Sequence, residues 1–463
     1  MSRSVPVELA VTLDRAAATA LPQQLAGALR DRVRDGELRP GVRLPSTRDL
    51  ARQLRVSRAV VQAAYDQLHA EGWLLGRVGA GTYVADVGGA DTPTRPATPP
   101  RQRATAARVV SLRPGVPLAE TRPHPTWRRA WREVSASVPP AGYPDPLGLV
   151  ELRAAVCEYL GRARGVACRP DEVMITTGTS HGWQLLLDAV LTDARRIGVE
   201  DPGYRKAVAA VRRAGRELVD VPVDRDGLIV DALPRDGALA AVYTTPAHQF
   251  PLGGRLPAGR RYALLDWARR HRSLIIEDDY DSEFRYDVAP LPALAQLDRA
   301  SVVYLGTASK TLGPALRIGW LVADADVVAR LAAFRSEVND LPAWPVQRAL
   351  LALFRDGHVD QTVRRVRRTY LDRCRRVCAA LAPYGEIVGE DAGLHVNLLL
   401  PDAATEARVC AIAATNGVEV DALSDLRRSA SGPRGLVVGY GANSDADLDY
   451  ALATLVAALR EGR

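Results

Sequence analysis

The sequence predicts an α/β protein in which an N-terminal winged helix-turn-helix precedes a large domain with a mainly parallel sheet and a smaller C-terminal α+β portion. The first indication is the length of 463 residues, which exceeds what a single hydrophobic core usually supports. The second is a pair of short helical patterns, joined by a tight turn, near the N-terminus. The third is an alternation of short apolar runs with helical stretches over the remaining chain, an order typical of parallel sheets.

The N-terminal elements follow from local periodicity. Apolar residues at helical spacing predict a helix over residues 23–34. Two further helices, over residues 47–54 and 58–70, are separated by so short a turn that they indicate a helix-turn-helix. Apolar runs on both sides of a glycine-rich segment then predict a hairpin wing with strands at residues 73–75 and 82–84.

Composition divides the chain into three parts. We assign residues 1–85 to the winged helix-turn-helix, residues 86–108 to a flexible linker rich in Pro, Thr, Ala and Arg, and residues 109–463 to the large domain. The apolar runs expected to form strands of the large domain, including its C-terminal α+β portion, are residues 173–176, 197–199, 241–243, 274–276, 302–305, 320–322, 394–400 and 435–440.

Composition also limits the class of protein. No apolar run reaches the roughly 20 residues that a membrane span needs, and Arg3 and Glu8 stand where a signal peptide would be apolar. We therefore expect a cytoplasmic protein that does not contact a membrane. The five cysteines are odd in number and contain no Cys-x-x-Cys spacing, so we expect idle or buried thiols and no metal site.

The basic residues are the most informative part of the composition. The net charge of +7 and the pI of about 9.3 are compatible with a polyanionic partner. Only Lys206 and Lys310 among the 61 basic residues are lysines. Because a guanidinium cannot serve as an amine nucleophile, a lysine kept in such a chain points to amine chemistry.

The segment from Arg43 to Tyr83 resembles the GntR-type winged helix-turn-helix, with Leu44, Pro45 and Leu50 among the matching residues. The resemblance implies binding to a double-stranded DNA operator, through serine and threonine hydroxyls and amides at helix starts and through arginines that reach phosphates or base edges. The alternative is that the serines only cap helices and the arginines are solvated. The candidate DNA-binding residues are Arg43, Ser46, Thr47, Arg48, Ser57, Arg58, Arg77 and Gly81.

Residues 306–319 resemble the cofactor-lysine segment of fold type I aminotransferases, in the version found in MocR/GabR regulators. The resemblance implies that Lys310 forms a Schiff base with pyridoxal 5'-phosphate, and that Arg317 and Thr307 bind its phosphate. It further implies that Asp278 pairs with the pyridine nitrogen and that Tyr280 hydrogen-bonds the ring oxygen. An acidic loop that merely faces solvent is the alternative for Asp278.

Three more segments converge on the same expected cofactor. The turn of Gly178, Thr179 and Ser180, with a helix from His181, should present backbone amides to the phosphate. Tyr204 matches the aromatic residue that stacks on the cofactor ring, although a tyrosine there could equally belong to the core. Residues 245–251 match the segment facing the ring oxygen, where either His248 or Gln249 makes the contact. Lys206 has no role by this resemblance and is expected at the surface.

Two functional hypotheses remain, a cofactor-dependent regulator and an active aminotransferase that retains a DNA-binding domain. Transaminases of this fold anchor the substrate carboxylate with an arginine, and Val437 stands at the position we align to it. This departure favours a regulator that senses pyridoxal phosphate or its amino-compound adducts, as in PdxR-type members controlling vitamin B6 genes, although Arg434 could substitute. The resemblance also implies a homodimer. A regulator with an empty pocket is the third possibility.

Overall fold

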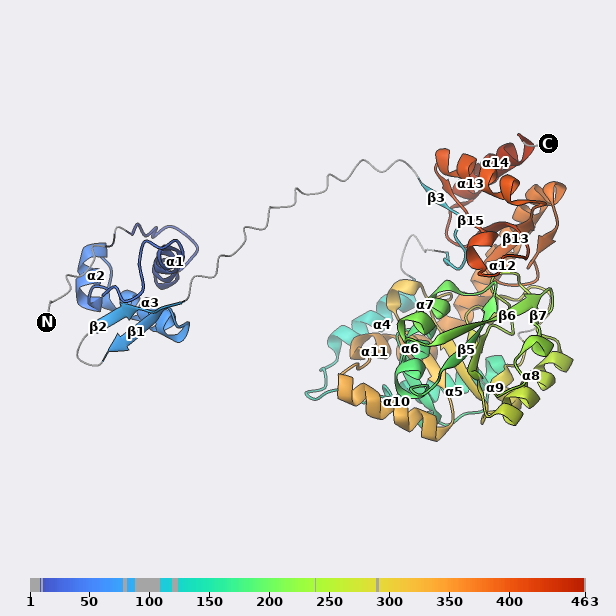
Figure 1. The fold of residues 1–463 in the computed structure, drawn as a ribbon, viewed down its shortest axis with the longest axis horizontal. Helices are drawn as coiled ribbons and strands as arrows, with labels where there is room; N and C mark the ends of the chain where they lie inside the picture. The colour runs from blue at the N-terminus through green and yellow to red at the C-terminus, as the bar shows by residue number, and fades with distance from the viewer. Residues whose placement is uncertain are drawn as a thin grey trace. The chain divides into compact units, whose positions relative to one another are not determined.

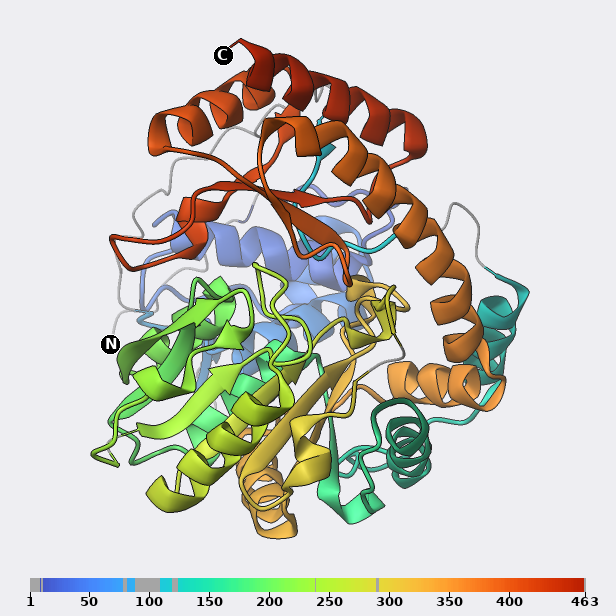
Figure 2. The same cartoon turned by 90° about the vertical axis from the view of Figure 1, so that its right-hand side faces the viewer.

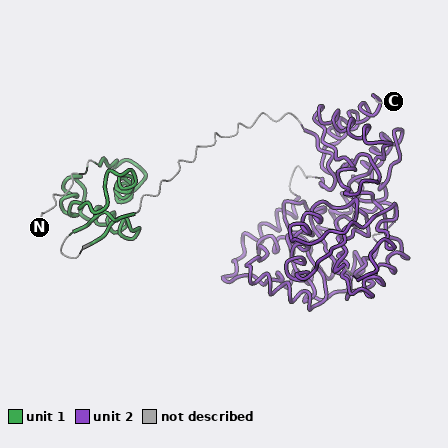
Figure 3. The backbone as a smooth tube through the Cα atoms, viewed as in Figure 1, with its two compact units in different colours: residues 1–103 green, residues 104–463 purple. Residues whose placement is uncertain are grey.

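The computed structural model describes residues 9, 11–77, 81–87, 109–118, 124–237, 239–288 and 291–461. The chain divides into two compact units, residues 1–103 and residues 104–463, which Figure 3 distinguishes by colour. From residue 88 onward, the predicted linker lies outside the described residues, as does the side chain of Arg77. Each unit is therefore described separately.

The N-terminal unit is a three-helix bundle with a two-stranded wing (Figure 1). Its elements are α1 (Leu21–Arg34), α2 (Thr47–Leu54), α3 (Arg58–Ala70), β1 (Leu74–Arg77) and β2 (Gly81–Val84). The predicted bounds of the second and third helices are confirmed. Helix α1 begins two residues before the predicted start, with Pro22 in its first turn, where the missing N–H has no intrahelical partner to lose.

One apolar core joins all five elements of this unit. Leu25, Leu50 and Val61 are completely buried, and they bring α1, α2 and α3 together. The hydroxyl of Tyr65 on α3 donates a hydrogen bond to the carbonyl oxygen of Pro45, at 3.0 Å, just before α2. Two helices of the helix-turn-helix are thus fixed relative to each other by both apolar and polar contacts.

The C-terminal unit is built on an eight-stranded sheet of order β4-β11-β10-β9-β8-β5-β6-β7. Strands β10, β9, β8, β5 and β6 are parallel neighbours, whereas β11 is antiparallel to both β10 and β4. The strands are β4 (Val173–Thr176), β5 (Arg196–Asp201), β6 (Glu217–Asp224), β7 (Gly227–Leu228), β8 (Leu239–Thr244), β9 (Leu274–Asp279), β10 (Val302–Thr307) and β11 (Gly319–Val322).

Helices cover both faces of this sheet, because alternate side chains of each strand point to opposite faces. Ile275 and Val302 pack in one apolar cluster, while their neighbours Ile276 and Val303 pack in another. The helices of the first layer are α5 (Val150–Arg164), α8 (Ala258–His271) and α11 (Trp344–Arg355), against which α4 (Pro125–Ala136) packs. Those of the second are α6 (Thr179–Ala189), α7 (Arg205–Arg213) and α10 (Ala325–Val338). Short α9 (Leu294–Leu297) contacts β10.

A smaller portion with its own core completes the unit, as Figure 2 shows in orange and red. Its antiparallel sheet has the order β12-β13-β16-β15, with α13 and α14 packed together beside it. The elements are α12 (His358–Leu381), β12 (Ile387–Val388), β13 (His395–Leu399), α13 (Ala403–Thr415), β15 (Asp421–Ala422), β16 (Gly435–Gly439) and α14 (Asp445–Arg460). In addition, β3 (Val110–Ser111) pairs with β14 (Val418–Glu419), so the start of the unit joins its C-terminal portion. The predicted fold class is confirmed.

None of the helices in the described ranges is long and apolar enough to cross a membrane.

We expect Leu50→Ala to destabilise the N-terminal unit selectively. The side chain is completely buried, so its truncation should lower the free energy of unfolding of that unit by about 2–5 kcal/mol. Thermal unfolding monitored in each unit separately would measure this change. Leu75→Ala is the matched control, because Leu75 is 52% exposed and its truncation should cost under about 0.5 kcal/mol. Equal effects of the two substitutions would contradict the assigned core.

Candidate functional site

Six strands end at one edge of the large sheet, because β6 points the same way as β4, β5, β8, β9 and β10. Five of them, β4, β5, β8, β9 and β10, lead into the site. Ligands of open α/β sheets bind at such carboxyl edges. The loops that follow these strands enclose a cavity of about 390 Å³. Its lining residues are Pro114, Gly115, Gly178, Thr179, Ser180, Tyr204, Lys206, Thr245, Phe250, Asp278, Tyr280, Thr307, Ser309, Lys310, Pro314 and Arg317.

Lys310 follows β10 and extends its amine into this cavity. Its Nζ donates a hydrogen bond to the carbonyl oxygen of Gly115. Burial lowers the pKa of Lys310, and the nearby charge of Lys206 acts in the same direction, while Asp281 and Asp278 oppose them. A larger fraction of the amine is therefore neutral, the form that attacks a carbonyl carbon.

Asp278 lies at the end of β9 and is 4% exposed. One carboxylate oxygen accepts a hydrogen bond from the hydroxyl of Tyr243, while Oδ1 is buried and has no partner among the described residues. Burial raises the pKa of Asp278 from 3.8 to about 7. An unpaired buried acceptor of this kind costs free energy unless a ligand donates a hydrogen bond to it. The acidic-loop alternative, in which Asp278 faces solvent, does not agree with this burial.

Gly178, Thr307 and Arg317 form a cradle at one end of the cavity. A Cβ atom on Gly178 would lie 3.8 Å from the Thr307 hydroxyl oxygen and 3.9 Å from Nη1 of Arg317. The φ of Gly178, +116°, also favours glycine. Helix α6 starts here, at Thr179 rather than at His181, so its first backbone amides face the same place. A guanidinium, a hydroxyl and a helix N-terminus together make an anion site.

Three aromatic rings also line the cavity. Phe250 meets both Tyr204, at a centroid distance of 6.0 Å, and Tyr280, at 6.1 Å, edge to face. The hydroxyl of Tyr204 lies 3.3 Å from that of Ser180, which ties the ring to the start of α6. Tyr204 is thus a cavity residue, in addition to packing beside one of the apolar clusters.

His248 and Gln249 do not line this cavity. Gln249 is completely buried and donates hydrogen bonds to the carbonyl oxygens of Pro202 and Phe250. His248 is 2% exposed and lies behind Tyr280, with its Nδ1 at 3.0 Å from the Tyr280 hydroxyl. The structure therefore places the predicted contact residue His248 one layer away from the cavity, behind the ring that it supports.

Sequence reasoning overlooked two parts of the cavity wall. Lys206, expected only as a surface residue, is exposed and also lines the cavity. Pro114 and Gly115 come from the segment after β3, and a Cβ on Gly115 would lie 2.9 Å from Nζ of Lys310. The scarcity of lysine was the only signal for Lys206, while Gly115 lies 195 residues before Lys310 and carried no signal.

Val437, at the expected arginine position, is completely buried on β16 and packs with Leu423 and Leu426. Arg434 precedes β16 and does not line the cavity. In the described part of the chain, Lys206, Lys310 and Arg317 are therefore the cations that line the cavity.

The candidate DNA-binding residues gather at the starts of α2 and α3. The hydroxyl oxygens of Ser46 and Ser57 cap these helices, accepting from the backbone N–H groups of Asp49 at 3.2 Å and Val60 at 3.4 Å. Nε of Arg58 donates to the hydroxyl of Thr47 at 3.3 Å and so joins the two helix starts. Both serines thus act as caps, as the alternative hypothesis supposed, and they remain exposed together with Arg48 and Arg58.

Arg43 and Gly81 lie at the base of the wing. Arg43 is half-buried, and its backbone forms an isolated antiparallel β-bridge with Tyr83. A Cβ on Gly81 would lie 3.0 Å from Nε of Arg43. Gly81 also has a φ of +112°, which favours glycine. The glycine therefore lets the Arg43 side chain lie against the wing.

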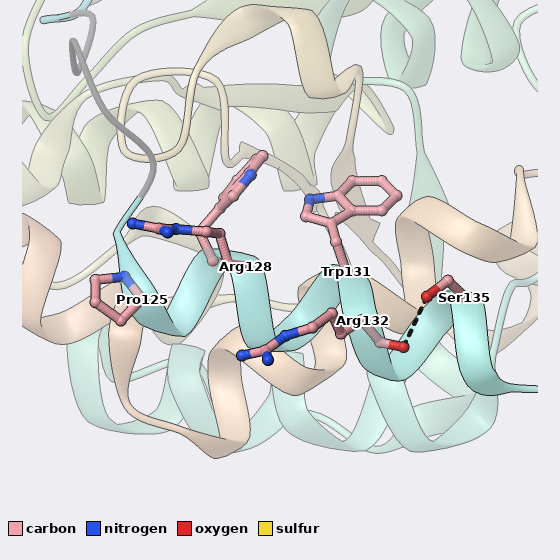
Figure 4. Close-up of a pocket in the computed structure, with 6 residues that line it drawn as sticks. Pro125, Arg128, Trp131, Arg132 and Ser135 are labelled. Atoms are coloured by element: carbon pink, nitrogen blue, oxygen red, sulfur yellow. Dashed lines mark hydrogen bonds between the residues drawn. The ribbon is translucent and has the colours of Figure 1, made fainter.

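A larger hollow of about 610 Å³ lies on the surface of α4 and contains none of the predicted site residues (Figure 4). The rings of Trp127 and Trp131 stand 6.0 Å apart, with Arg128 and Arg132 beside them. This hollow is lined by residues of a single helix, whereas the smaller cavity is lined by the loops that follow five strands. Across the described ranges, no group of three or more His, Cys, Asp or Glu side chains is arranged to hold a metal ion.

Comparisons with known proteins match the N-terminal and C-terminal units to two different families. Residues 21–84 match the family of bacterial regulatory proteins called gntR, and residues 107–453 match aminotransferase class I and II. The HTH-type pyridoxine biosynthesis transcriptional regulator PdxR of Corynebacterium glutamicum is 36% identical over 98% of this chain and 99% of its own. The probable rhizopine catabolism regulatory protein MocR of Rhizobium meliloti is 33% identical, over 93% and 92%.

Solved structures match the C-terminal part. An archaeal alanine:glyoxylate aminotransferase superposes with a TM-score of 0.72 at 24% identity, covering 77% of this chain and 92% of that one. LysN, an α-aminoadipate aminotransferase from Thermus thermophilus complexed with N-(5'-phosphopyridoxyl)-L-leucine, gives a TM-score of 0.68 at 25% identity, covering 76% and 92%.

We expect Asp278→Asn to stabilise the protein in the absence of any ligand, and increasingly so as the pH rises. Because the folded-state pKa is raised to about 7, the native protein holds a proton that the unfolded chain has lost, and stability falls between pH 3.8 and about 7. Asparagine avoids this loss, so the difference in free energy of unfolding should grow to about 2–4 kcal/mol and then level off.

Urea unfolding at a series of pH values measures that difference. The same substitution at exposed Asp193 is the control and should change the free energy of unfolding by less than about 0.5 kcal/mol. A difference for Asp278→Asn that stays constant with pH would rule out the buried, unpaired carboxylate.

Proposed function

The chain belongs to the MocR/GabR-type family of transcription regulators, and from this membership we propose that its DNA binding responds to pyridoxal 5'-phosphate held in the cavity of the aminotransferase-like domain. The observation that carries the proposal is the buried Oδ1 of Asp278, which has no partner in the described structure, in the same cavity as the amine of Lys310 and the cradle around Arg317. The three groups complement three parts of one ligand.

The residues present fit pyridoxal phosphate. Asp278 would accept the hydrogen bond of the protonated pyridine nitrogen, which satisfies its orphaned oxygen. Arg317, Thr307 and the amides of Gly178, Thr179 and Ser180 would hold the phosphate dianion. Tyr204 would stack on the ring, and Lys310, with its pKa lowered by burial, would bond the aldehyde carbon. When bound, the cofactor supplies an aldehyde that reacts reversibly with primary amines.

The relatives support a regulatory interpretation of this site. The curated protein at 36% identity is a pyridoxine biosynthesis transcriptional regulator, and LysN, at 25% identity, holds a phosphopyridoxyl compound. The aminotransferase alternative is not favoured, because Val437 is packed in an apolar cluster where those enzymes need a carboxylate-binding arginine. Genes of vitamin B6 or amino-acid metabolism are the targets that this interpretation suggests.

Lys206 is our candidate for recognising an acidic effector. Lys310 is committed to the aldehyde and Arg317 to the phosphate, which leaves Lys206 as the remaining cation of the described cavity wall. An amino-acid-like effector would direct its amine toward Lys310 and its carboxylate toward Lys206. Regulation would then be a linkage between this cavity and the DNA-binding residues of α2 and α3. A homodimer in the cytoplasm, reading two operator half-sites, is part of the same proposal.

The first experiment measures binding of the full chain to DNA upstream of its own gene, with and without pyridoxal phosphate. We expect specific binding whose affinity changes about 5-fold or more with the cofactor, and Lys310→Ala to lose that change. Arg48→Ala, on the exposed face of α2, should weaken DNA binding but retain the cofactor's visible absorbance. An affinity for DNA that does not change with the cofactor would contradict the proposal that the protein senses pyridoxal phosphate. Absence of specific DNA binding would favour the hypothesis of an active aminotransferase.

A second experiment tests Lys206 through the visible spectrum of the bound cofactor. Titration with L-alanine and with methylamine compares amines with and without a carboxylate. We expect Lys206→Ala to weaken the response to L-alanine about 10-fold, the cost of one charge-assisted hydrogen bond, and to leave the methylamine response unchanged. Equal weakening of both responses would show that Lys206 acts on the amine of Lys310 and does not recognise the carboxylate.

A further inference from the structure

His248 forms a buried polar cluster that the proposed function has not used. It lies in the loop after β8, and its Nδ1 is 3.1 and 3.0 Å from the two carboxylate oxygens of Asp281, beyond β9. The same Nδ1 lies 3.0 Å from the hydroxyl of Tyr280, a residue of the cavity wall. His248 and Asp281 are each 2% exposed or less. One ring nitrogen therefore faces three oxygens away from solvent.

The three contacts determine where the proton of His248 lies. A carboxylate only accepts hydrogen bonds. If Nδ1 were unprotonated, it would be a third acceptor facing the two carboxylate oxygens of Asp281, with no proton between them. Nδ1 must carry the proton, which it shares with Asp281 and the oxygen of Tyr280. Nε2 is buried without a partner in the described structure, and a proton on it would be an unsatisfied buried donor. The geometry thus selects the neutral form protonated at Nδ1.

Two glycines lie close to this ring and leave space for it. A Cβ on Gly393 would lie 2.3 Å from Cε1 of His248, and one on Gly253 would lie 3.3 Å from Nε2. On the far side, the ring of His395 on β13 stands 5.4 Å away and donates from its own Nε2 to the carbonyl oxygen of Pro251 at 2.9 Å. Burial lowers the pKa of His395 to about 4, so this neighbour is neutral.

We propose that the Asp281–His248 pair positions the hydroxyl of Tyr280 so that its proton points into the cavity, toward the ring oxygen of pyridoxal phosphate. The Tyr280 oxygen accepts the proton of Nδ1, so its own proton cannot be donated to His248 and is free for the ligand. Burial, followed by the charge of Asp281, raises the pKa of Tyr280 well above its ordinary value, so the hydroxyl keeps that proton. This inference rests on the proposed function, while His248 itself touches no ligand.

The test is a pH titration of the visible absorbance of pyridoxal phosphate bound to the full chain. A donated hydrogen bond stabilises the negative charge on the ring oxygen after the bound cofactor loses its proton, so loss of the donor raises the midpoint. We expect Tyr280→Phe and His248→Leu each to raise it by about 1 pH unit. His248→Asn, whose amide can donate from the place of Nδ1, should shift it by less than a third of that. Asp278, Asp281 and Lys206, which also act on Lys310, and His395 are unchanged in every variant.

The double variant shows whether His248 acts through Tyr280. Combining His248→Leu with Tyr280→Phe should give the midpoint of Tyr280→Phe alone, because the second change removes the group that the first one orients. Fully additive shifts, or a His248→Leu midpoint equal to that of the wild type while Tyr280→Phe moves it, would overturn the proposal.

Nitrogen-15 NMR of labelled histidines in the unliganded wild-type chain gives a readout that is independent of the cofactor. We expect His248 to be protonated at Nδ1, with its signal assigned by loss in His248→Asn. A proton found on Nε2 overturns the proposal. A wild-type chain that shows no visible band with pyridoxal phosphate would refute the proposed function, and the NMR result would still decide how His248 orients the hydroxyl.

Discussion

Parallel pairing of β8, β9 and β10 is the constraint on which the rest of the site depends. It aligns Leu305 of β10 with Asp278 of β9, and Thr244 of β8 with Glu277, so three distant segments end together. Residues that follow these strands, Thr245, Tyr280 and Lys310, then line one cavity. Because the register of a sheet is set by its whole buried surface, a shift of one residue would turn Asp278 to the other face.

The three consecutive acids of β9 show how the fold separates structural from functional charge. Glu277 accepts hydrogen bonds from the backbone amides of Leu294 and Ala295, at 2.9 and 3.0 Å, where α9 begins. Asp279 pairs with buried Arg164 at 2.6 Å and accepts from the hydroxyl of Tyr304 at the same distance. Asp278 lies between these two residues, with its side chain on the opposite face. Oδ1 of Asp278 and Oδ1 of Asp279 both lack a partner in the described structure, but only Asp279 has its charge paired with an arginine there. A buried charge is costly unless it is paired, so Asp278, which forms no ion pair in the described structure, is where the cationic ring nitrogen of the proposed cofactor would fit.

The contrast between the cavity wall and the buried Val437 explains why a transaminase fold can serve regulation. The phosphate cradle and the groups for the pyridine ring are present, whereas the β16 position that would hold a substrate carboxylate carries Val437 against Leu423 and Leu426. A chain that retains the cofactor-binding groups and lacks the arginine would still bind the proposed cofactor but would lack one determinant of turnover. The N-terminal unit keeps the exposed arginines and helix starts that a DNA contact needs.

Local patterns in the sequence determined the helices of the N-terminal unit and the motifs of the candidate site. Helices over residues 47–54 and 58–70 were predictable because helical periodicity and serine caps act within a few residues, and the motifs around Asp278 and Lys310 identified the expected cofactor groups by family resemblance. Tertiary structure alone decided that Gly115 contacts Lys310 across 195 residues, that β3 pairs with β14, that Lys206 reaches the cavity and that His248 stands behind Tyr280. These features depend on how loops from different strands pack at the sheet edge, and such packing leaves no periodic trace in the sequence.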